Sequence, residues 1–162
     1  MEAKIKRPNV WMRLKAWIGV IPTFEYPIVY ADGYISRAKS DLALRTPYGI
    51  LIGRWIVSLA EPSKMNFDDG IRFCKDLCFA GKKGYLPKVC LLKHIKRNFT
   101  RINDLISCVG GAPIGCGYYL SSQSDTEFSG HYTAVRMNNS DVVLEYALHS
   151  SEKANIRPVF HL

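Results

Sequence analysis

The chain has 162 residues and a formal net charge of +8, a length that fits one domain, or one domain with an appendage. Apolar residues make up 48% and charged residues 22%, which is ordinary for a globular protein and excludes a disordered, collagen-like or coiled-coil chain. No apolar run reaches the roughly 18 residues that a membrane helix needs.

The positive charge is concentrated in two blocks. Residues 1–15 hold five bases and one acid, and residues 81–101 hold seven bases and no acid. A basic block can bind nucleic acid, an anionic membrane or an acidic partner. A solvated surface is the more common explanation of such charge, so nucleic-acid binding stays an alternative.

Residues 1–27 alternate basic with aromatic or aliphatic side chains and are expected to form an arm or short helix ahead of a domain over residues 28–162. One face of that helix would carry Trp11, Leu14, Trp17 and Ile18. The apolar run after Trp17 is interrupted at Pro22, and no clear cleavage site follows, so we expect mature chain rather than a signal peptide. The compartment stays open.

Strands are expected next. Residues Ile28–Tyr30 are β-branched or aromatic, and Asp32–Gly33 after them is a strong hairpin signal. Residues Tyr48–Leu59 have the same character and are divided by Gly53, which predicts two strands or one bent strand.

Two helices should follow. The first begins after Asn66, a good N-cap, and runs to Gly81 with Cys74 and Cys78 on one face. The second opens after the segment 84–87 and ends at Gly110–Gly111. Its expected apolar stripe, continuous over more than four turns, is Leu91, Leu92, Ile95, Phe99, Ile102, Leu105 and Ile106. Its opposite face would carry Lys93, Lys96, Arg97 and Arg101.

The remaining chain is expected to be β. The predicted strands are Gly117–Ser121, His131–Met137, Val142–Leu148 and Ile156–Phe160. The middle pair would be joined by a turn at residues 138–141. Strands, then two helices, then strands predict an α+β domain with helices packed on mixed or antiparallel sheets. The first and last strands are expected to pair and to bring the termini together.

The five cysteines show no zinc-binding spacing, and an odd number does not complete a set of disulfides. We therefore expect free thiols that serve as small core residues, with Cys74 and Cys78 at least partly buried on the first helix. No metal site or cofactor is expected.

Six short motifs in order resemble the C-type-lectin-like superfamily, and more narrowly a bacterial branch of it. They are Tyr30–Gly33, Phe67–Gly70 with Cys74, Gly84–Pro87, Gly110–Gly111, Tyr119–Ser122 and Ile156–Val159. The resemblance covers about residues 30–162. Tyr85 and Leu120 stand where the family usually has tryptophan, and Lys88 stands where a capping Ser or Thr is usual.

The resemblance implies a ligand-facing surface over about residues 118–149. Its candidate binding residues are Gln123, Arg136, Asn138, Tyr146 and His149, with Arg136 and Tyr146 close together across the hairpin. The calcium-binding runs of the animal lectins in this superfamily are absent, so binding should not need calcium.

The resemblance therefore implies a non-enzymatic domain of a bacterial or phage protein that binds a protein or glycan. Family members often lie at the cell surface. One alternative is a variable tip or receptor-binding protein diversified by a retroelement, a class that shares this fold. Another is a basic module that binds nucleic acid through Lys93, Lys96 and Arg97.

Overall fold

The computed structural model describes residues 22–162, which form an α+β fold with two antiparallel sheets and a small two-stranded one. The predicted N-terminal helix, with Trp11 to Ile18, lies outside the described residues. Residues 23–27, expected to belong to the arm, are part of the first strand.

The first sheet has five strands in the order β10-β4-β3-β1-β2, all antiparallel. Its strands are β1 (Thr23–Tyr30), β2 (Ile35–Ala38), β3 (Pro47–Ile52), β4 (Trp55–Ser58) and β10 (Val159–His161), and a 3-10 helix η1 (Lys39–Ala43) follows β2. The predicted hairpin after Tyr30 is confirmed. Two strands meet at Gly53, whose φ of +61° favours glycine. The expected pairing of first and last strands is wrong, because β2 and β3 occupy both edges of β1.

The first long helix, α2 (Phe67–Asp76), is shorter than expected. Its N-cap is confirmed, since Asn66 Oδ1 accepts the Asp69 N–H at 2.9 Å. The helix ends because Leu77 is extended, and the chain turns into a small hairpin of β5 (Cys78–Phe79) and β6 (Lys82–Lys83). Cys78 is therefore exposed outside the helix, and its expected place on the helix is wrong.

The second predicted helix is divided into α3 (Val89–Arg97) and α4 (Phe99–Cys108). Asn98 breaks it with φ −114° and ψ 26°, and its side-chain amide donates to the carbonyl of His94 at 3.0 Å. The prediction of a single continuous helix is thus wrong. The buried apolar stripe is nevertheless confirmed from Leu91 to Ile106.

The second sheet has three antiparallel strands in the order β7-β8-β9. They are β7 (Gly117–Ser124), β8 (His131–Met137) and β9 (Glu145–His149). The predicted connection after Met137 is confirmed, but it runs to Leu144, so β9 begins three residues later than the predicted strand. The last predicted strand begins three residues late, directly after Pro158, which has no backbone N–H to donate to a neighbouring strand.

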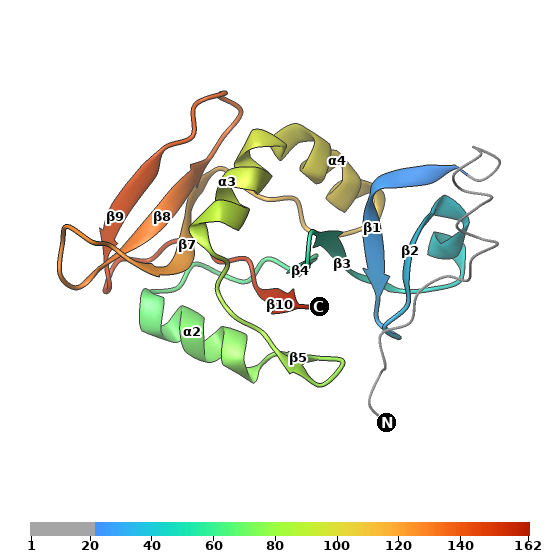
Figure 1. The fold of residues 1–162 in the computed structure, drawn as a ribbon, viewed down its shortest axis with the longest axis horizontal. Helices are drawn as coiled ribbons and strands as arrows, with labels where there is room; N and C mark the ends of the chain where they lie inside the picture. Colours follow the sequence, from blue (N-terminus) through green and yellow to red (C-terminus); the bar gives the residue numbers. More distant parts are fainter. Residues whose placement is uncertain (1–21) are drawn as a thin grey trace.

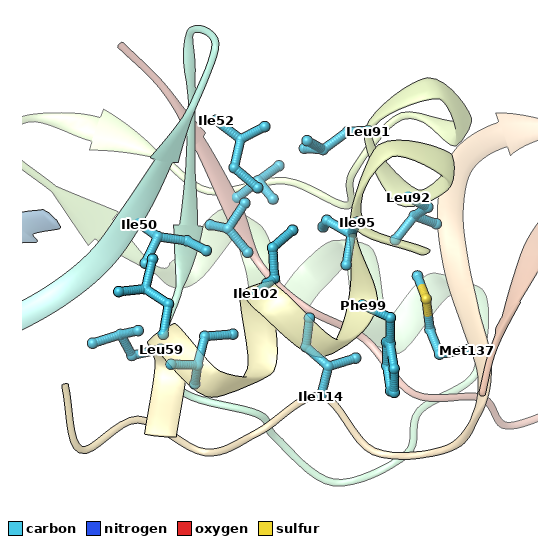
Figure 2. Packing of buried hydrophobic residues seen from close by; sticks show 14 of the residues in the cluster. Ile50, Ile52, Leu59, Leu91, Leu92, Ile95, Phe99, Ile102, Ile114 and Met137 are labelled. Atoms are coloured by element: carbon cyan, nitrogen blue, oxygen red, sulfur yellow. The ribbon is translucent and has the colours of Figure 1, made fainter. Parts of the chain in front are cut away.

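Helices α3 and α4 lie between the two sheets (Figure 1). Their stripe packs on Ile50 and Ile52 from the first sheet and on Met137 from the second, and Figure 2 shows this core from close by. Helix α2 covers the opposite face of the second sheet, where Phe67 stacks on Tyr132. Each sheet therefore buries residues on both faces.

The two sheets are also joined by a buried ion pair. Arg157, 1% exposed, donates to Glu61 Oε2 at 2.6 Å and to the carbonyls of Ser58 and Ala112. The Tyr119 hydroxyl donates to Glu61 Oε1 at 2.5 Å. Burial lowers the pKa of Arg157 and raises that of Tyr119. The network links the approach to β10 with β7, the strand that begins the candidate site.

Candidate ligand-binding surface

The five predicted binding residues do not form one site, because they divide between the two faces of the second sheet. Tyr118 pairs with Arg136, and Ala134 pairs with Tyr146. Side chains two apart, or directly paired, share a face. Arg136 and Tyr146 therefore lie on the face that α2 partly covers, while His149 points to the α3 side.

Arg136 and Tyr146 lie near each other as expected. Arg136 N–H donates to the carbonyl of Leu144, which places Arg136 diagonally across from Tyr146. The Tyr146 ring meets Tyr118 edge-on, with centroids 4.7 Å apart. We call Tyr118, Arg136 and Tyr146 the tyrosine–arginine cluster. Arg136 is exposed, so its guanidinium fork can bind a carboxylate or phosphate beside a flat aromatic surface.

Gln123 has a structural role that its sequence position did not reveal. Its Oε1 accepts the backbone N–H of Val89, the first residue of α3, at 2.9 Å. Lys88, at the N-cap, makes no side-chain cap bond. Gln123 thus caps the first N–H of α3 from strand β7, whereas a Ser or Thr at position 88 would accept an N–H one or two residues further along the helix.

Asn138 is also engaged inside the protein. Lys96 Nζ donates to its carbonyl at 2.7 Å and to its side-chain oxygen at 2.6 Å, and to the carbonyl of Ser140 as well. Lys96 is only 4% exposed, so the prediction that it lies on a solvated basic face is wrong. The reason is the hairpin turn, whose oxygens replace water around the ammonium.

The other members of the predicted basic face differ in how they are paired, and Arg101 lies 3.6 Å from Glu25. Lys93 pairs with Glu145 on β9 at 2.5 Å. Arg97 is exposed near the break between the helices. Of the three cations proposed to bind nucleic acid, Lys93, Lys96 and Arg97, only Arg97 therefore has no partner within the described residues.

His149 lies at the far end of β9. Its Nδ1 is 2.8 Å from the Ser151 hydroxyl, and its ring meets that of His131 edge-on with centroids 5.2 Å apart. His131 Nδ1 in turn is 3.0 Å from the carbonyl of Ser129. These contacts fix the loops at that end of the sheet.

A groove of about 610 Å³ lies between α3 and the α3-facing side of the second sheet, within the range of ligand sites. We call it the α3–β9 groove. It is lined by Val89, Cys90, Lys93, Gln123, Ser124, Asp125, Thr126, Glu127, Phe128, Thr133, Glu145, Tyr146 and Ala147. Of these, the predicted ligand-binding residues included only Gln123 and Tyr146, while Lys93 was named for the nucleic-acid alternative. The excess of acids over bases after residue 101, in a basic chain, was the available signal for the carboxylates Asp125, Glu127 and Glu145.

Within residues 22–162, no three His, Cys, Asp or Glu side chains gather as a metal site would need. No helix there has the length and apolar character to cross a membrane.

No protein-family model, no curated protein and no solved structure matches the chain.

Proposed function

We propose that this protein is a C-type-lectin-like domain that binds a protein or glycan ligand without calcium and without catalysing a reaction. The tyrosine–arginine cluster carries the proposal. It combines an exposed guanidinium with two half-buried aromatic rings on a sheet that packs against other elements on both faces. Tyr and Arg are the residue types that most often anchor binding interfaces.

The arrangement of the motifs supports the lectin-like assignment. The segment Gly84–Pro87 leads from the β5–β6 hairpin into α3, and a Cβ at Gly84 would lie 2.8 Å from the carbonyl oxygen of Cys74. Glycine there allows this close approach of two chain segments. Arg157, from the last motif, is the buried arginine between the sheets. Two of the six motifs thus have structural reasons for their residues.

Binding is favoured over catalysis because most of the polar side chains at this sheet bond to other groups of the protein. His131 and His149 hold loop groups, while Gln123 and Asn138 hold α3 and the hairpin turn. The guanidinium of Arg136 and the carboxylates of Asp125 and Glu127 have no ion-pair partner within the described residues and are left to meet a ligand.

The test is a glycan and peptide array probed with the full chain, with and without EDTA. Arg136→Ala and Tyr146→Ala should fold normally and lose at least about tenfold in affinity, the loss of a hot-spot side chain. Arg97→Ala is the matched control, since Arg97 is exposed but lies on α3. EDTA should change nothing. Full affinity in both cluster variants would overturn the proposal, as would loss of binding with the chelator.

A further inference from the structure

The second sheet ends in an open edge. β9 pairs with β8 over its whole length and has no strand on its other side within residues 22–162. Figure 1 places β9 at the outer side of the molecule. All five of its residues are exposed or half-buried. An open edge presents backbone N–H and C=O groups that can pair with another extended chain.

The groove beside this edge is acidic, although the chain as a whole is basic. Its lining residues include three carboxylates, Asp125, Glu127 and Glu145, and one ammonium, Lys93. Because Lys93 pairs with Glu145, the charges of Asp125 and Glu127 remain without a cation among the described residues. Asp125 Oδ1 accepts the backbone N–H groups of Glu127 and Phe128, which holds this loop in place.

An aromatic ring completes the groove. Phe128 is 55% exposed, and the face of a phenyl ring attracts ammonium and guanidinium groups. The groove therefore offers two uncompensated carboxylates and a ring next to a free strand edge, which is suited to a cationic chain.

We propose that β9 and the α3–β9 groove bind an extended peptide that carries basic side chains at alternate positions and pairs with β9 as a fourth strand. The proposal rests on the binding function proposed above and narrows its ligand to a basic peptide segment. Side chains of an added strand alternate between the two faces of the sheet. One set would reach the carboxylates of the groove, and the other would lie beside Tyr146 in the tyrosine–arginine cluster.

A second copy of the chain is a poorer occupant of the same edge. Antiparallel pairing of two β9 strands places a two-fold axis perpendicular to the sheet, so both acidic grooves would lie on one side. Like charges brought together in this way oppose association. Charge complementarity therefore favours a basic peptide.

The probe is a fluorescent peptide of alternating lysine and valine, seven residues long, titrated with the full chain by anisotropy. Its controls are the glutamate–valine analogue and two N-methylated versions, one methylated at the lysine amides and one at the valine amides. An added strand pairs along one edge only, so one N-methylated peptide should bind and the other should fail. The glutamate analogue should not bind.

Two protein variants locate the binding. Asp125→Asn combined with Glu127→Gln keeps the loop hydrogen bonds and removes both charges, and should weaken binding about five- to tenfold, the sum of two exposed ion pairs. Asp104→Asn, which removes an exposed carboxylate from α4, should have no effect. Cys90 lines the groove, so with Cys78, Cys108 and Cys116 changed to serine its alkylation should slow when peptide is bound.

The proposal is overturned if the lysine–valine peptide does not bind, if both N-methylated peptides bind equally, or if the double variant keeps full affinity. It is also overturned if sedimentation shows a dimer that the peptide cannot dissociate. If the lysine–valine peptide does not bind but an array ligand depends on Arg136 and Tyr146, the proposed function stands and only this inference is refuted. If the peptide binds along the edge of β9 and the Arg136→Ala and Tyr146→Ala variants bind it with full affinity, this inference stands and the role of the tyrosine–arginine cluster is refuted.

Discussion

Removing the carboxylate of Glu61 should destabilise the protein strongly, because it leaves the guanidinium of Arg157 buried without its counter-ion. Arg157 is 1% exposed, and in the Glu61→Ala variant it loses its carboxylate partner while keeping its bonds to the carbonyls of Ser58 and Ala112. Breaking a buried pair by removing one partner costs about 3–5 kcal/mol. The Glu61 side chain is 16% exposed, so water can enter, and we expect a loss near the lower end, about 3 kcal/mol.

Urea unfolding, followed by circular dichroism, measures this loss in the free energy of unfolding. For a chain of this length, about 3 kcal/mol corresponds to a fall in melting temperature of roughly 6–12 °C. Glu25→Ala is the matched control, since Glu25 forms an exposed pair with Arg101 at 3.6 Å, worth at most about 1 kcal/mol. Adding Arg157→Met to Glu61→Ala should recover stability, because no buried charge then remains. If Glu61→Ala unfolds like the Glu25→Ala control, the reasoning about the buried charge is refuted.

Three further predictions concern the buried lysine and the thiols. Lys96→Met should lower the free energy of unfolding by about 1–3 kcal/mol, the cost of lost bonds to a charged donor, and should increase hydrogen exchange in residues 138–144; unchanged exchange there would contradict the role given to Lys96. An Ellman titration of the native, reduced protein should detect four reactive thiols, with the fifth, Cys74, appearing only in denaturant, since Cys74 is the buried one. Burial raises the pKa of the Cys74 thiol to about 12, so the unfolded chain releases this proton first as the pH rises, and stability should fall above about pH 9. Cys74→Ala should show a shallower fall over that range, and an equally steep one would mean that Cys74 is not responsible.

Much of the fold could be predicted from local patterns. The glycine-divided strands β3 and β4, the Asn66 cap and the apolar stripe of α3 and α4 all depend on neighbours in sequence. The pairing of the last strand is decided by distant segments, since β1 is already paired on both edges, which leaves β10 to pair with β4. The break at Asn98 is local, because its side-chain amide bonds to the carbonyl of His94, but the apolar stripe continues through it and hides it in the sequence pattern.

The candidate site, like the fold, was predicted correctly only where local sequence decides the structure. Arg136 and Tyr146 were correctly placed together, because a hairpin register fixes both. Gln123, Asn138 and Lys96 were assigned by residue type as free groups, yet each is used by a partner at least 34 positions away. Local sequence does not encode such contacts. The acidic groove was missed for the same reason, since its walls come from α3, β8, β9 and the loop after β7.

The position of β10 has a consequence for how the protein is made. β10 completes the outer edge of the first sheet by pairing with β4, from which most of the described chain separates it. During synthesis, β4 with its apolar residues Ile56 and Val57 is present long before Val159–His161 leave the ribosome. An unpaired apolar strand is a site for aggregation. A nascent chain stalled before residue 159 would therefore expose an unpaired, aggregation-prone edge of β4.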